Sequence, residues 1–209
     1  HDNNISANEY NSSVHKSLTC TACHIQEGES SINKLTKDKN SCVVSFKPMN
    51  CSSCHSSVAK EHELSVHNSA RLPVSCSKCH ADIHTITSIK NDKKASAKLC
   101  SQCHEKESSY FKSVHFMSLE KGNDAATCTD CHNKHAINKI DNVSEGRIFH
   151  TEACMKCHAD TSMMFRSNVT TIAPKSYFES YHGKNIRLGY PEKVAGCSDC
   201  HSAHNILPQ

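Results

Sequence analysis

Hydrophobic residues along this chain stand singly or in short clusters, and polar stretches separate them. The segments that favour helices are about 51–69, 98–119 and 152–166. Segments 27–50, 83–97 and 136–150 are rich in Ser, Asn, Lys and Asp and are predicted to be loops. No stretch alternates long enough to predict a strand. The expected fold class is mostly irregular with short α-helices and little or no β-sheet, with a bend near 166–180 where Pro174 interrupts the pattern.

The composition lacks the groups that usually fill a core. Hydrophobic residues make up 36% of the 209 residues, aromatic residues only 5%, and there is no Trp. Such a chain leans towards disorder. Fifteen cysteines and 17 histidines indicate the opposite. Some group other than aliphatic side chains must therefore supply buried mass.

Fourteen of the fifteen cysteines fall into seven Cys-x-x-Cys-His motifs. The cysteine pairs are Cys20 and Cys23, Cys51 and Cys54, Cys76 and Cys79, Cys100 and Cys103, Cys128 and Cys131, Cys154 and Cys157, and Cys197 and Cys200. The motif histidines are His24, His55, His80, His104, His132, His158 and His201.

This spacing matches covalent haem attachment. Two thiols add across the two vinyl groups at one porphyrin edge, and the following His reaches the iron as proximal ligand. Zinc sites use Cys-x-x-Cys pairs but do not require His after every second cysteine. A disulfide framework does not use repeated pairs of this kind. The motifs predict seven haem c groups.

On these motifs the chain resembles the multihaem c-type cytochromes built from doubled Cys-x-x-Cys-His motifs, from about residue 13 to the end. The resemblance implies low-potential electron transfer in anaerobic or metal- and nitrogen-compound-respiring systems. We expect one haem-packed body over 1–209, with internal repeats at about 13–62, 63–110, 111–165 and 166–209.

Two recurring elements supply candidate distal ligands. The first is Ser-x-His, and the second is a His three or four residues after the third, fifth and seventh motifs, followed by x-Ile. The Ser-x-His candidates are His15, His67, His115 and His182, and the trailing candidates are His84, His135 and His204. His132 and His135 are expected to share one face of a helical turn. A trailing His therefore cannot ligate the iron of its own motif and is predicted to ligate a neighbouring haem.

Seven haems need seven distal ligands, and the two sets supply seven. His62 and His150 are reserve candidates, and methionine ligation is unnecessary. The supply is uneven, because no His trails His24 whereas the last motif has both His182 and His204. Three explanations are open. The chain folds back so that a C-terminal His ligates an N-terminal haem, or His62 or His150 supplies the missing ligand. Alternatively, a C-terminal His ligates a haem of the next copy in a head-to-tail assembly.

Bis-His ligation throughout leaves no open iron, which favours an electron carrier over an enzyme. The alternatives are a protomer of an extracellular conducting filament and a multihaem reductase with one open haem. Redox protein donors and acceptors are the expected partners. The net charge of +3 says little about partners, since seven haems would add roughly fourteen propionate charges. No nucleic-acid partner is expected.

The chain carries no apolar run of the length that a transmembrane helix needs. It begins at His1, which is typical of a processed form, and an N-terminal lipid anchor is not expected without an N-terminal Cys. Covalent haem attachment predicts a periplasmic or extracellular location. Cys42 is the odd cysteine, expected to be free or paired between molecules. An attachment that uses Cys42 with Cys54 is a less favoured alternative.

Overall fold

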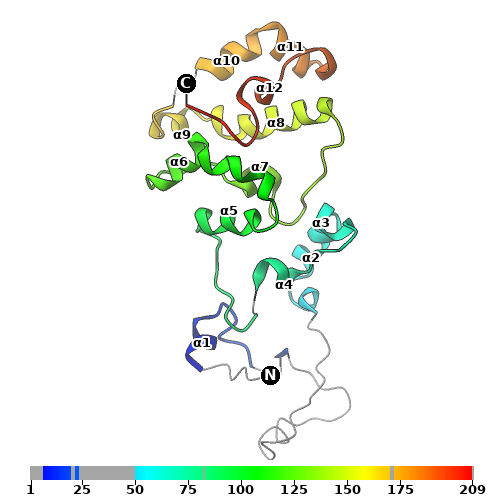
Figure 1. Cartoon of the computed structure of the whole chain (residues 1–209), viewed down its shortest axis with the longest axis vertical. Helices are drawn as coiled ribbons and strands as arrows, with labels where there is room; N and C mark the ends of the chain where they lie inside the picture. Colours follow the sequence, from blue (N-terminus) through cyan, green and yellow to red (C-terminus); the bar gives the residue numbers. More distant parts are fainter. Residues whose placement is uncertain (1–6, 20–21, 24–49, 82, 170–171, 209) are drawn as a thin grey trace, which may run out of the picture. The chain divides into compact units, whose positions relative to one another are not determined.

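The computed structural model describes residues 7–19, 22–23, 50–81, 83–169 and 172–208. These residues form short helices joined by irregular segments, without a strand in the described ranges (Figure 1). The α-helices are α1 (Ala7–Ser12), α2 (Ser56–Glu63), α3 (Val66–Ser69), α4 (Cys76–His80), α5 (Lys93–Ser101), α6 (Val114–Glu120), α7 (Cys128–His132), α8 (Val143–His158), α9 (Thr161–Arg166), α10 (Ile172–Glu179), α11 (Tyr181–Arg187) and α12 (Cys197–His201). The 3-10 helices are η3 (Cys51–Ser53), η4 (Glu105–Lys112) and η5 (Pro191–Lys193). The helical, sheet-free class is confirmed for this part of the chain.

Helix positions agree with the predictions in part. The helices expected over 51–69 and 152–166 are confirmed, and the 98–119 segment is divided among α5, η4 and α6. The loop predicted over 136–150 is wrong from Val143 onward, because the Asn142 side chain accepts from Glu145 N and starts α8. The loop predicted over 83–97 ends at Lys93 in the same way, where the Asp92 side chain caps α5. Most of 27–50 lies outside the described residues.

Pro174 does not interrupt the chain. It lies in the first turn of α10, where a missing N–H costs no intrahelical hydrogen bond. Most of the second half of the segment 166–180, where a bend was expected, is therefore helix α10.

The chain forms two compact units. The first contains residues 1–63 and 67–88, and the second contains 64–66 and 89–209. In the second unit, α12 lies between α8 and the pair formed by α10 and α11 (Figure 1). The prediction of internal repeats is not tested by this division.

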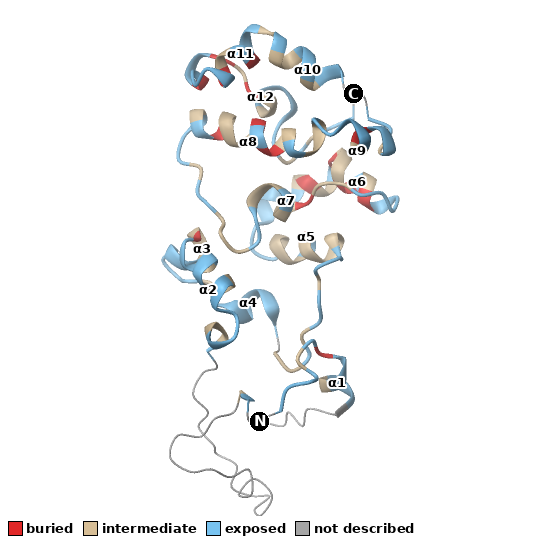
Figure 2. Ribbon diagram, turned by 180° about the vertical axis from the view of Figure 1, so that it is seen from behind, coloured by how far each residue is buried: buried red, intermediate tan, exposed pale blue. Residues whose placement is uncertain are grey.

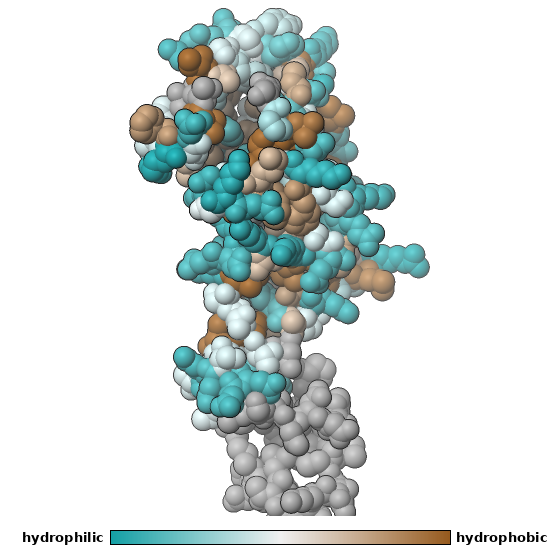
Figure 3. All heavy atoms as spheres, turned by 60° about the vertical axis from the view of Figure 1, so that its left-hand side comes forward, coloured by the Kyte–Doolittle hydropathy of each residue, from teal (hydrophilic) through white to brown (hydrophobic). Residues whose placement is uncertain are grey.

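Few side chains are buried. The main cluster lies in the second unit and contains Ala97, Tyr110, Phe116 and Leu119. Figure 2 shows how sparse the buried positions are along α6 to α12. Large hydrophobic side chains such as Phe165, Leu72 and Leu64 are 86%, 82% and 77% exposed. Figure 3 shows hydrophobic residues interspersed among hydrophilic ones on one face of the molecule. The described residues alone therefore form a thin core.

No described helix has both the length and the hydropathy needed to cross a bilayer.

Candidate functional site

Four of the described Cys-x-x-Cys-His motifs lie on helical turns. The third, fifth and seventh motifs are the short helices α4, α7 and α12, and the sixth is the last turn of α8. Positions i, i+3 and i+4 share one face of a helix. The two thiols and the imidazole of each such motif therefore lie on one side, as attachment to a single planar group requires. Cys20 and His24 lie outside the described residues.

Two motif helices begin with the same acidic cap. In α7 and α12 the third helical residue, Asp130 or Asp199, accepts a hydrogen bond of 2.7 Å from the N–H of the residue before the helix. Each carboxylate also meets a cation, Lys93 in the first case and Arg147 in the second. The Asp position inside the motif thus fixes the start of the helix that holds both cysteines.

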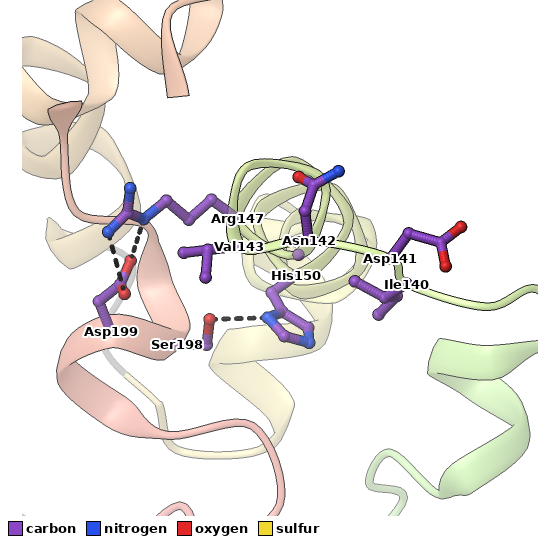
Figure 4. Close-up of a pocket in the computed structure, with 9 residues that line it drawn as sticks. Ile140, Asp141, Asn142, Val143, Arg147, His150, Ser198 and Asp199 are labelled. Carbon is purple, nitrogen blue, oxygen red and sulfur yellow. Dashed lines mark hydrogen bonds and ion pairs between the residues drawn. The ribbon is translucent and has the colours of Figure 1, made fainter. Parts of the chain in front are cut away.

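Arg147 holds the start of the seventh motif through several hydrogen bonds. Its Nε lies 2.8 Å from Asp199 Oδ2, and its NH1 donates to the carbonyls of Pro191 and Glu192 at 2.8 and 3.1 Å. The Arg147 side chain is only 19% exposed. Arg147 and Asp199 line a pocket of about 420 Å³ beside α8, where His150 Nδ1 also lies 2.7 Å from Ser198 Oγ (Figure 4).

Replacing Arg147 by Ala should destabilise the chain by about 2–3 kcal/mol, since it removes charge-assisted bonds that are largely shielded from water. The hydrogen bond from Arg147 lowers the pKa of Asp199. A carboxyl with a lowered native pKa contributes stability above its unfolded pKa and loses it as pH falls through the native value. The difference between the two proteins should therefore shrink below about pH 4. Denaturant unfolding across pH measures it.

Arg166 on α9 is exposed and gives the matched control. Arg166→Ala should stay within about 0.5 kcal/mol of the parent at every pH. An Arg147→Ala loss that persists unchanged at low pH would contradict the role assigned to Asp199.

Three pairs of histidines have the separation of opposing metal ligands. The ring centroids are 6.1 Å apart for His15 and His55, and 6.2 Å for His115 and His158. They are 6.0 Å apart for His132 and His204. Two imidazoles that bind one metal ion from opposite sides, each through a nitrogen about 2 Å from it, have centroids about 6 Å apart. Each pair joins a motif His to a candidate distal His.

Burial favours the neutral form of three of these rings. Desolvation lowers the pKa of His115, His132 and His158, and neighbouring histidines lower it further. Neutral imidazole is the form that binds metal. For His115, His132 and His158 the environment therefore favours the form that iron ligation needs.

A backbone hydrogen bond joins each Ser-Val-His segment to a His-x-Ile segment. Val14 N donates to Ile86 O at 2.8 Å, Val66 N to Ile137 O at 2.9 Å, and Val114 N to Ile206 O at 2.8 Å. We call each arrangement a segment pair. The serines of these segments are almost fully buried, with exposed fractions of 2% for Ser13, 1% for Ser65 and 0% for Ser113.

The third segment pair holds two distal candidates against consecutive motifs. Its His204 faces His132 of the fifth motif, and its His115 faces His158 of the sixth. The His trailing the seventh motif thus meets the fifth motif. That a trailing His lies against another motif was predicted, but the segment pairing was not. The only sequence signal for it is the equal number of Ser-Val-His and His-x-Ile segments.

The sequence-based reason for expecting a trailing His to meet another motif, a shared helical face, is wrong. His132 and His135 do not share a helical face, because α7 ends at His132 and Asn133 has φ +63°. Ala81 and Ser202, at the equivalent positions after the third and seventh motifs, have φ +52° and +59°. Non-glycine residues adopt this region only at a cost of about 1–3 kcal/mol each. A strained turn therefore directs the chain away after each of these motifs.

Other predicted ligands have different surroundings. His182 Nδ1 accepts a hydrogen bond of 3.1 Å from Ala195 N, which places the proton of the neutral ring on Nε2. His150 is bonded to Ser198, and His62 lies half-buried on α2. For His67, His84 and His135 an iron partner stays a prediction.

Cysteines of consecutive motifs lie in contact. A hydrogen bond between Cys100 and Cys128 lowers the pKa of Cys100 to about 7 and raises that of Cys128. A bond between Cys154 and Cys197 lowers the pKa of Cys197 to about 6. These contacts join the fourth motif to the fifth and the sixth to the seventh. The described cysteines are free of disulfides.

The residues present fit a haem iron held between two imidazoles. In the described residues no three His, Cys, Asp or Glu side chains converge on a point where a bare metal ion would bind. Comparison with protein-family models, with curated proteins and with solved structures finds no match for this chain.

Proposed function

We propose that the protein is an electron carrier with seven covalently bound haem c groups, ligated on both sides by histidine. The observation that carries this is the set of three histidine pairs 6.0–6.2 Å apart. Each pair combines the His of a Cys-x-x-Cys-His motif with one from a recurring distal element. Two histidine imidazoles, one on each side of the haem iron, are the axial ligands typical of low-potential electron-transfer haems.

The contacts between cysteines support transfer from haem to haem. If Cys100 and Cys128 each carry a thioether, the edges of two haems are attached at neighbouring points, and the same holds for Cys154 and Cys197. The third segment pair brings the ligands of the fifth and sixth haems together. Attachment points and ligand pairs therefore alternate along the second unit, and a continuous path from the fourth to the seventh haem follows.

The sparse core also supports bound haem. A chain with few buried side chains and exposed cysteines and histidines leaves apolar surface that porphyrin rings would cover. Histidine ligands on both sides of the iron leave no position for a substrate, which favours a carrier over a reductase. The periplasmic or extracellular location and the head-to-tail assembly stay predictions.

The decisive experiment is the intact mass of the full chain produced in a host that attaches haem c. We expect the mass of the polypeptide plus seven haems, with ferric spectra that are low-spin. The double variant Cys197→Ala, Cys200→Ala should carry six. An unmodified polypeptide mass, a bound zinc ion, or a mass lowered by two hydrogens for each disulfide would contradict the proposal.

A further inference from the structure

One histidine pair differs from the other two in its surroundings. His204 Nδ1 lies 2.6 Å from Glu107 Oε2, so a carboxylate contacts one ring nitrogen of the histidine that is paired with His132. The planes of His132 and His204 are also close to parallel, 21° apart. In the pairs His15–His55 and His115–His158 the planes are 57° and 49° apart.

The contact determines that Nδ1 of His204 carries a proton. A carboxylate oxygen only accepts hydrogen bonds, so Nδ1 must carry the proton and donate it to Glu107. In the neutral ring the lone pair available to a metal ion is then that of Nε2. A metal-binding histidine whose second nitrogen donates to a carboxylate is held in orientation and becomes a more basic ligand.

We propose that Glu107 is a positioning residue that lowers the reduction potential of the haem carried by Cys128 and Cys131. This inference rests on the proposed function. A more basic ligand and a nearby negative charge both stabilise ferric over ferrous iron. That haem is therefore harder to reduce than the haem between His115 and His158, its neighbour in the same unit.

The position of Glu107 in the chain restricts its effect on the reduction potential to one haem. It lies on η4, between the fourth motif and the Ser113-Val-His segment that forms the third segment pair. The segment pair thus brings Glu107 and His204, 97 residues apart in sequence, to the fifth haem. Glu107 is 48% exposed, so water weakens its charge, and a moderate effect is expected.

The test is a potentiometric titration of the haem-loaded full chain and its Glu107→Gln variant. Glutamine keeps an acceptor oxygen for His204 and removes the charge. At a fixed potential, we expect the oxidised-to-reduced ratio of one haem to fall about three- to tenfold in the variant, a positive shift of about 30–60 mV. Glu107→Ala should shift the same haem at least as far.

Electron paramagnetic resonance identifies the haem. Its near-parallel ligand planes should give a rhombic low-spin signal distinct from those of the tilted pairs, and that signal should change in Glu107→Gln. Glu105→Gln, on the same helix, is the control and should leave this signal and the potential of this haem unchanged. Unchanged potentials and spectra in both Glu107 variants would overturn the inference. Absence of covalent haem would instead overturn the proposed function, so the two failures are distinguishable.

Discussion

Replacing His204 by Ala in the haem-loaded protein should convert one of seven haems from six-coordinate low-spin to five-coordinate high-spin. The reason is that His204 faces His132 with ring centroids 6.0 Å apart, the distance of two imidazoles around one iron. Among the described residues, the neighbouring His150 is already bonded to Ser198 and is not expected to replace it. Low-temperature electron paramagnetic resonance and resonance Raman spectra of the ferric protein measure the number of high-spin haems.

The variant should also gain a property that the parent lacks. An open axial position binds carbon monoxide in the ferrous state, so one equivalent should bind to the variant and none to the parent. His150→Ala is the matched control, because this ring lies in the same region but makes no such pair. A high-spin haem in His150→Ala, or none in His204→Ala, would contradict the ligand pair.

The ligand types could be predicted from the sequence, because local spacing determines them. In the third, fifth, sixth and seventh motifs the two cysteines and the histidine lie on one helical turn, as their five-residue span allows. The distal candidates were found by recurrence, and three of the seven face a motif histidine in the described residues. Which motif each one faces depends on hydrogen bonds such as Val114 N to Ile206 O, between residues 92 positions apart. Local pattern has no information about such contacts.

Two errors have local causes that the sequence did contain. Asn142 and Glu145 have the spacing of a helix start, yet the Asn- and Asp-rich composition around them favoured a loop. Helical continuation after His132 was assumed because His132 and His135 are three residues apart. The positive φ at Asn133, Ala81 and Ser202 is sustained by long-range packing of the segment that follows each motif. Glu107 was missed because a single exposed glutamate gives no pattern.

Gly183 is the position where one added methyl group should damage the fold most. It lies on α11 where this helix packs against α10, and a Cβ built there would overlap Tyr177 O and lie 2.6 Å from Phe178 Cα. Backbone atoms cannot rotate away as a side chain can, so the two helices would have to separate. Gly183→Ala should destabilise the full chain by about 3 kcal/mol or more, measured by denaturant unfolding.

Gly146→Ala is the control that distinguishes this steric clash from the general effect of replacing a helical glycine by alanine. Gly146 lies inside α8, and its Cβ would meet Ile140 Cγ2 at 3.4 Å, an ordinary contact. Gly146→Ala should therefore raise stability by about 0.5–1 kcal/mol through better helix propensity. The loss at Gly183 should also release Tyr177 OH from Ala195 O and His182 from Ala195 N, the two bonds that join α10 and α11 to the approach to α12. If Gly183→Ala unfolds within about 0.5 kcal/mol of the parent, the close crossing of α10 and α11 is wrong, and the position of His182 that depends on it is wrong as well.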